Sequence, residues 1–113
     1  IVAHSLGASM VLKFLSENPA TKNIKGVFLI ATPFWSGTED WKQGLKLKEK
    51  FEEHLPIHIP FFLYHAKDDE EVPFSHFNKY KRKMPEANFH ERKTGGHQFD
   101  HNLTLIANDI TSL

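Results

Sequence analysis

Runs of apolar residues that are typical of buried strands alternate with helix-spaced segments along this chain of 113 residues. The strand-like runs are short and rich in β-branched or aromatic residues, as in strands that are covered on both faces. The alternation favours an α/β fold, with a mostly parallel sheet flanked by helices. The expected strands are residues 1–3, 24–31, 61–65 and 88–92, and the expected helices are residues 6–18, 74–83 and 103–113.

Side-chain spacing makes two of these helices amphipathic. In the first, Leu6, Met10 and Phe14 lie four residues apart, while the charged residues fall on the other face. The closing helix places on one face Leu103, Ile106, Ile110 and Leu113. No linker or repeat interrupts the pattern, so residues 1–113 are expected to form a single domain.

The segment 32–58 has a different character. Ser36 with Glu39 fits a capping box at the start of a helix. The following stretch, residues 41–55, is heavily charged and keeps apolar residues at roughly helical spacing: Trp41, Leu45, Phe51 and Leu55. We therefore expect a helical excursion or a small cap over the body of the domain.

Composition excludes several classes of protein. The 14 basic and 14 acidic side chains cancel, which argues against a nucleic-acid partner. There is no cysteine, so disulfides, a thiolate nucleophile and cysteine zinc sites are excluded. No apolar run approaches the roughly 18 residues that a membrane span requires. His97 and His101 have the spacing of a helical metal pair, but no HExxH motif accompanies them, and we expect neither metal nor cofactor.

The most specific motif is Ala3-His4-Ser5-Leu6-Gly7, between the first strand and the first helix. A serine on such a tight turn presents its hydroxyl above the carboxyl edge of the sheet, and small residues on either side let strand and helix pass closely. The backbone N–H of Leu6, at the helix start, points to where an oxyanion would develop. An ordinary serine N-cap after a strand would give the same local pattern.

A serine nucleophile needs a base and an acid that orients the base, and the later loops offer both. Asp68 and Asp69 follow the third strand, and His97 follows two glycines in the loop after the fourth. The order serine, acid, histidine is that of the α/β-hydrolases. Taken alone, the acidic loop would indicate only a solvated surface, and the histidine only a surface or core residue.

On these motifs the chain resembles the C-terminal half of an α/β-hydrolase-fold serine hydrolase. It is similar to the family of the retinoblastoma-binding serine hydrolase and its bacterial YdeN-type relatives. The resemblance implies Ser5 as nucleophile and His97 as general base. Because the family places its acid three residues before a Val or Leu that precedes Pro, it selects Asp69, with Asp68 as the alternative. It also implies that the first strands of the sheet and a second oxyanion donor lie before Ile1.

The expected activity is hydrolysis of a small acyl ester or related bond through an acyl-enzyme, and the resemblance leaves esterase, thioesterase and amidase open. Phe34 and Trp35 follow a strand and are expected either to line the acyl pocket or to pack beneath the 32–58 segment. The alternative is a hydrolase-fold module that binds a protein partner with little or no catalysis. The lack of cysteine and the resemblance favour the cytoplasm.

Overall fold

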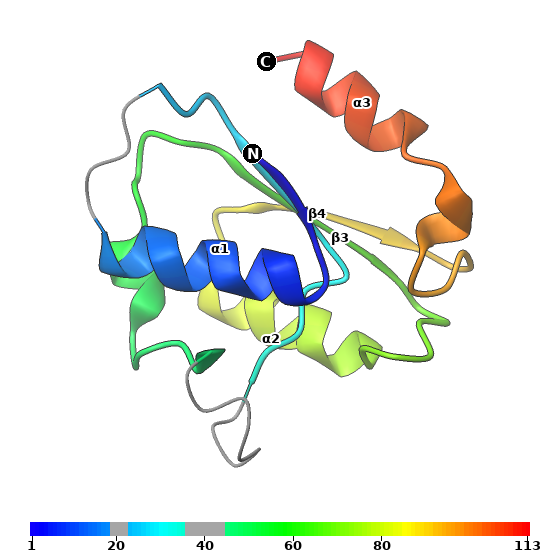
Figure 1. Cartoon of the computed structure of the whole chain (residues 1–113), viewed down its shortest axis with the longest axis horizontal. Coiled ribbons are helices and arrows are strands. Elements are labelled where there is room, and N and C mark those ends of the chain that lie inside the picture. Colours follow the sequence, from blue (N-terminus) through cyan, green and yellow to red (C-terminus); the bar gives the residue numbers. More distant parts are fainter. Residues whose placement is uncertain (19–22, 36–44) are drawn as a thin grey trace.

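The computed structural model describes residues 1–18, 23–35 and 45–113 (Figure 1). The strands form one parallel sheet in the order β1-β2-β3-β4, so each strand pairs with the next along the chain. Their bounds are Val2–His4 for β1, Val27–Ile30 for β2, Phe61–Ala66 for β3 and Asn88–Arg92 for β4. The parallel sheet confirms the α/β class that the alternation predicts.

Helices cover both faces of this sheet. Neighbouring strand residues point to opposite faces, and in β2 Leu29 packs with helices α1 (Leu6–Glu17) and α2 (Phe74–Lys83), whereas Phe28 packs with helix α3 (Thr104–Thr111). Figure 1 shows α1 and α2 together on one side of the strands, with α3 apart from them. The described chain therefore has the three layers of an α/β fold, which is why its inner strands β2 and β3 are mostly apolar on both faces.

The apolar row predicted for α1 is largely exposed. Leu6, Met10 and Phe14 are 42%, 52% and 60% exposed, and the residues that α1 buries are instead Ala8, Ser9, Leu12 and Leu15. Helix α1 joins β1 to β2, and β1 is the outermost of the four described strands, so among these strands none lies beneath an apolar row on the outer side of α1. In α3, similarly, Ile106 is buried while the other three predicted face residues are exposed.

The helix predicted over 41–55 is wrong for the part that the structure describes. Residues 45–55 contain the short 3₁₀-helix η2 (Phe51–His54) rather than a continuous α-helix. Lys50 has a φ of 60°, in the left-handed region, so an α-helix cannot run through it. Leu47, Phe51 and Leu55 are nonetheless buried in the core. Ser36, Glu39 and Trp41 lie outside the described residues.

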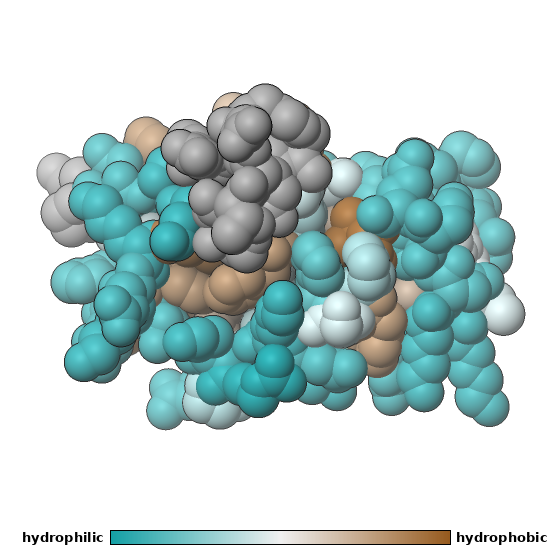
Figure 2. Space-filling model, turned by 90° about the horizontal axis from the view of Figure 1, so that it is seen from below, coloured by the Kyte–Doolittle hydropathy of each residue, from teal (hydrophilic) through white to brown (hydrophobic). Residues whose placement is uncertain are grey.

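The face of the molecule that is seen from below is mostly hydrophilic (Figure 2). Seen from below, hydrophobic atoms show in only a few places among polar side chains (Figure 2). Within the described ranges, none of the helices has the length and apolar character needed to span a bilayer.

Candidate active site

Ser5 occupies a strained turn between β1 and α1. Its backbone φ of 56° and ψ of −125° are unusual for a residue with a side chain, and such a conformation costs about 1–3 kcal/mol. The backbone N–H of Ser5 donates to the carbonyl of Ile30, 2.8 Å away at the end of β2, which holds the turn on the sheet. Leu6 begins α1, where a backbone N–H has no acceptor within the helix. The Ala-His-Ser-Leu-Gly motif thus lies on a tight turn between a strand and a helix, while the roles of Ser5 and Leu6 stay predictions.

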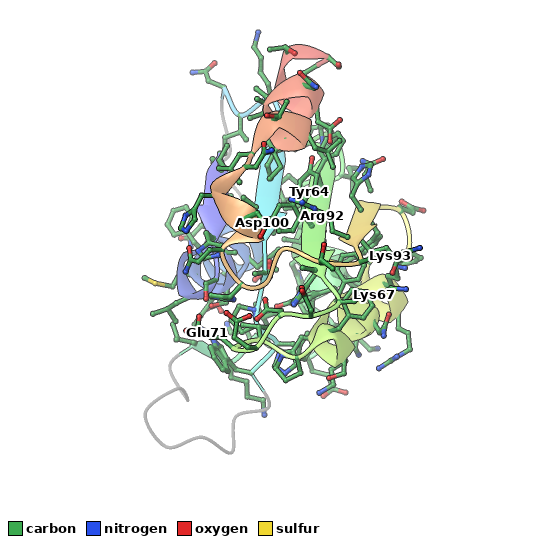
Figure 3. The ribbon with its side chains drawn as sticks, turned by 90° about the vertical axis from the view of Figure 1, so that its right-hand side faces the viewer. Tyr64, Lys67, Glu71, Arg92, Lys93 and Asp100 are labelled. Carbon is green, nitrogen blue, oxygen red and sulfur yellow. The ribbon has the colours of Figure 1, made fainter. Side chains whose placement is uncertain are left out.

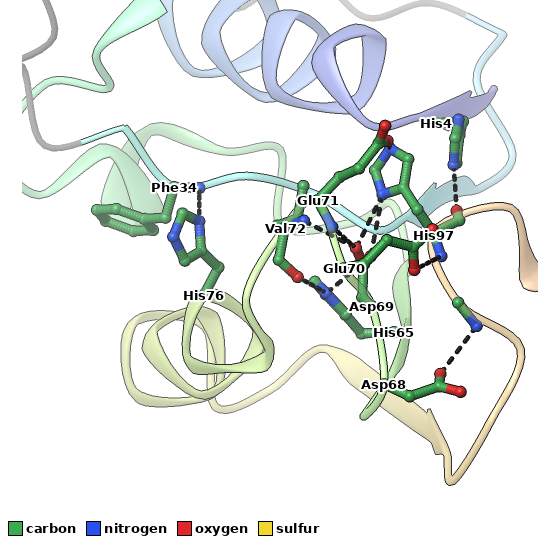
Figure 4. Close-up of polar contacts among 11 residues, drawn as sticks. His4, Phe34, His65, Asp68, Asp69, Glu70, Glu71, Val72, His76 and His97 are labelled. Carbon is green, nitrogen blue, oxygen red and sulfur yellow. Dashed lines mark hydrogen bonds and ion pairs between the residues drawn. The ribbon is translucent and has the colours of Figure 1, made fainter.

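His97 lies beside Asp69 at the carboxyl ends of the strands. Nδ1 of His97 is 3.0 Å from Oδ2 and 3.2 Å from Oδ1 of Asp69, and both side chains are almost completely buried (Figure 4). Asp68 instead accepts a hydrogen bond from the backbone N–H of Gly96 at 2.8 Å. Asp69, and not Asp68, therefore contacts the histidine ring.

The Asp69 carboxylate is held by donors on three sides. Its Oδ1 accepts the backbone N–H groups of Glu71 at 2.8 Å and Val72 at 2.7 Å. Its Oδ2 lies 3.3 Å from Nε2 of His65, which also donates to the carbonyl of Val72 at 2.9 Å. Burial lowers the pKa of His65, although Val72 and Asp69 oppose this, so the ring is neutral and carries its proton on Nε2.

Burial alone would raise the pKa of the Asp69 carboxyl. The hydrogen bonds from the Val72 N–H, the His97 ring and the Glu71 N–H outweigh it, so the pKa lies below its ordinary value. A carboxyl with a lowered pKa stabilises the fold above its unfolded-state pKa of about 3.9, and this contribution is lost as the pH falls through the folded-state value.

We expect Asp69→Asn to weaken the acid dependence of stability. The free energy of unfolding, measured by urea titration, should fall less steeply below about pH 4 in the variant than in the unaltered protein, since the variant has lost this titrating group. Asp68→Asn serves as the control, because the exposed Asp68 side chain accepts the backbone N–H of Gly96 and does not contact the His97 ring among the described residues. Equal pH slopes for Asp69→Asn and the unaltered protein would contradict the prediction.

Three further side chains that contact His97 have no site role in the sequence prediction. Nε2 of His4, the residue before Ser5, is 2.7 Å from the carbonyl oxygen of His97, and their ring centroids are 4.7 Å apart. Glu70 accepts the backbone N–H of His97 at 3.3 Å, and Glu71 Oε2 lies 3.0 Å from Nε2 of the ring. The sequence predicts that His4 packs or forms a hydrogen bond within the turn. For Glu70 and Glu71, the one sequence feature that could have indicated a contact with His97 is their position next to Asp69.

Ser5 and His97 are not joined in this structure. In the part of the chain that is described, no hydrogen bond links the Ser5 hydroxyl to the ring, and Nε2 of His97 faces Glu71 instead (Figure 4). The contact between His97 and Asp69 is thus formed, while a contact between His97 and the Ser5 hydroxyl is not.

Steric constraints favour glycine at position 96, directly before His97. Gly96 has a φ of 64°, and a Cβ at this position would lie 3.0 Å from Oε2 of Glu70. A side chain would therefore be strained and would push against the carboxylate that accepts the His97 N–H. On the far side of the loop, Arg92 pairs with Asp100 at 3.5 Å, and the two are neighbours in Figure 3.

Phe34 and Trp35 follow β2 along the chain and border a surface cavity. The cavity, of about 580 Å³, is lined by both aromatic residues together with Leu47, Phe51 and the lysines 46, 48, 50 and 83. Phe34 also packs on Tyr80 in the core, with ring centroids 4.9 Å apart. Trp35 donates from Nε1 to the hydroxyl of Ser9, 3.3 Å away and one turn of α1 after Ser5. The two residues therefore both pack and line a cavity, and a role in substrate binding stays a prediction.

Among the described residues, no group of three or more His, Asp or Glu side chains is arranged to hold a metal ion. The acidic loop is instead engaged with the histidine loop, since the carboxylates of residues 68–71 all contact Gly96 or His97.

Comparison with known proteins shows the family to which this chain belongs. A model of the serine hydrolase family matches residues 1–102. The protein YdeN of Bacillus subtilis is 30% identical over 102 residues, which cover 86% of this chain and 52% of YdeN. This chain thus spans about half the length of that relative.

Solved structures show the same fold. The crystal structure of the Bacillus subtilis ydeN gene product superposes with a TM-score of 0.72 at 24% identity, over 98% of this chain and 62% of that one. The esterase domain of a Rhodothermus marinus protein gives a TM-score of 0.68 at 15% identity, over 98% of this chain and 57% of that one. A thioesterase domain from the curacin biosynthetic pathway gives 0.66 at 16% identity, with 97% and 63% covered. The chain has a partial α/β-hydrolase fold and belongs to the serine hydrolase family.

Proposed function

We propose that this chain carries the catalytic triad of a serine hydrolase, with Ser5 as nucleophile, His97 as general base and Asp69 as the acid that orients it. The observation that carries the proposal is the buried contact between Asp69 and Nδ1 of His97, in the same edge region as the strained Ser5 turn. Membership of the serine hydrolase family supports the same reading.

Each residue has a defined task in the proposed reaction. The Ser5 hydroxyl oxygen forms a bond to the carbonyl carbon of an acyl substrate while its proton passes to Nε2 of His97. Asp69 keeps the other ring proton on Nδ1 and stabilises the imidazolium. The bond to the leaving oxygen then breaks, and that oxygen takes the proton from Nε2. Water repeats the sequence, which releases the acid and restores Ser5.

The backbone N–H of Leu6 supplies one donor for the oxyanion that forms in these steps. We place the acyl group of the substrate near Phe34 and Trp35, because Trp35 reaches α1 one turn beyond Ser5 and both residues line the same cavity. A small carboxylic ester is the default substrate, with thioesters and amides as further acyl classes. The proposed location is the cytoplasm, as the sequence suggests.

A second candidate function is a hydrolase-fold module that binds a protein partner without turnover. The observation that favours it is the engagement of His97 Nε2 by Glu71 rather than by Ser5. In that reading the Asp69–His97 pair would be intact but would leave Ser5 without a base.

A fluorophosphonate probe distinguishes the two functions, because it reacts only with an activated serine. In the intact protein we expect the probe on Ser5, located by peptide mass spectrometry. Ser5→Ala should remove the label completely. His97→Ala should slow labelling by about 10²–10⁴-fold, the range for loss of a general base.

Two exposed residues supply matched controls. Ser75→Ala and His58→Ala make the same substitutions at exposed positions away from the site, and both variants should label at the unaltered rate. Absence of labelling on Ser5, under conditions in which a known esterase reacts, would favour the binding module instead.

A further inference from the structure

The Glu71 carboxylate lies beside Nε2 of His97, the atom from which a leaving group would receive its proton in the proposed reaction. Glu71 Oε2 is 3.0 Å from Nε2 of His97, and the Glu71 side chain is 62% exposed. Its backbone is fixed, because the Glu71 N–H donates to Asp69 at 2.8 Å. Only the side chain of Glu71 therefore needs to turn for the carboxylate to leave the ring.

The contact with Glu71 occupies Nε2 of His97. Nδ1 faces the Asp69 carboxylate and Nε2 faces the Glu71 carboxylate, and ionised carboxylates only accept hydrogen bonds. While Nε2 is turned to Glu71, it is not free to take the proton of Ser5. For His97 to act as a base, Glu71 has to give up this contact.

Other cations do not compete for Glu71. Within the described ranges, His97 is the one basic side chain that pairs with it. Lys67 pairs with Glu91 at 3.8 Å, and Figure 3 shows Lys67 and Lys93 on the opposite side of the view from Glu71. The carboxylate is consequently available to a positive group that enters the site from solvent.

We propose that Glu71 is a specificity-determining residue that favours acyl substrates whose leaving group carries a positive charge close to the scissile bond. This inference rests on the proposed hydrolase function. A cationic leaving group pairs with the carboxylate and draws it away from Nε2, which frees His97 to accept the Ser5 proton. A neutral leaving group of the same shape cannot pair with the Glu71 carboxylate and so does not draw it away from His97.

Two esters of the same shape test the charge directly in the intact protein. Butyrylcholine carries a quaternary ammonium group, and 3,3-dimethylbutyl butyrate places a neutral tert-butyl group at the same position. We expect kcat/KM to favour butyrylcholine by about fivefold, the upper range for a solvent-exposed ion pair. The preference should shrink as salt is added, because salt screens such pairs.

Glu71→Gln should bring the ratio of the two kcat/KM values close to one. Glu86→Gln makes the same charge change at an exposed position in a groove beside the first residues of β3 and β4, and it should keep the unaltered ratio. An unaltered ratio in Glu71→Gln, a preference for the neutral ester, or a Ser5 that labels with fluorophosphonate while neither ester is hydrolysed would each overturn the proposal.

A second measurement does not depend on turnover. Diethyl pyrocarbonate reacts with an unprotonated imidazole nitrogen, so Glu71→Gln should speed modification of His97 by about fivefold, as judged by peptide mass spectrometry. An unchanged rate would show that Glu71 does not restrain the ring. If this rate rises while Ser5 fails to label, the proposed hydrolase function is overturned although the contact of Glu71 with His97 is real.

Discussion

Asp69→Asn is expected to lower kcat for p-nitrophenyl butyrate by about 10⁴-fold, the magnitude of this change in a Ser-His-Asp triad. The amide oxygen can replace Oδ1 as the acceptor for the backbone N–H groups of Glu71 and Val72. The amide NH₂ group then faces Nδ1 of His97 in place of Oδ2. Nδ1 has to accept, the ring proton moves to Nε2, and the base is lost.

Asp68→Asn is the matched control for this experiment. Asp68 accepts the backbone N–H of Gly96, and an asparagine oxygen can do the same. We expect its kcat within about threefold of the unaltered value, since a surface substitution that keeps its hydrogen bond perturbs little. If Asp68→Asn lowers kcat more than Asp69→Asn does, then Asp68 rather than Asp69 orients His97. Urea unfolding of both variants would show that they are folded.

Phe77→Ala is expected to reduce the free energy of unfolding by about 3–5 kcal/mol, the usual cost of removing a buried phenylalanine ring. Phe77 is 1% exposed and lies in α2 against β3 and β4. Its ring centroid is 5.8 Å from that of His65 and 5.4 Å from that of Phe89. The loss is a large part of the 5–15 kcal/mol by which a domain is usually stable.

Asn78→Ala provides the comparison for Phe77→Ala. Asn78 is the next residue of α2 and is exposed, so the helix context is the same while no cavity forms. The expected change is within about 0.5 kcal/mol. Both variants are to be measured by urea titration of the intact protein, and similar losses for the two would contradict the packing described for Phe77.

Sequence patterns predict the parts of this fold that are set by local chemistry. The alternation of strand and helix, the helix Phe74–Lys83 and the turn at Ser5 each depend on neighbours along the chain. The family spacing before Val72 and Pro73 selects Asp69, and the structure places Asp69 rather than Asp68 on the histidine ring.

The remaining features depend on contacts between distant segments. Periodicity shows that α1 has an apolar row, but the position of β1 at the sheet edge decides that Leu6, Met10 and Phe14 stay exposed. The hydrogen bond between His4 and the carbonyl of His97 spans 93 residues, and no local pattern indicates it. The contact of Glu71 with the ring likewise exists only once two loops meet.

The acidic loop, residues 68–71, contacts the loop that carries Gly96 and His97. The number of residues between β3 and α2 is therefore important for these contacts. Residues 68 to 71 each reach a different group on Gly96 or His97, and all four lie consecutively. A single residue inserted or deleted there would shift every carboxylate onto its neighbour's partner, while a change of one side chain would remove only one contact. Relatives that keep this arrangement should therefore tolerate substitutions in the loop more readily than insertions or deletions, and an alignment of loop lengths would show it.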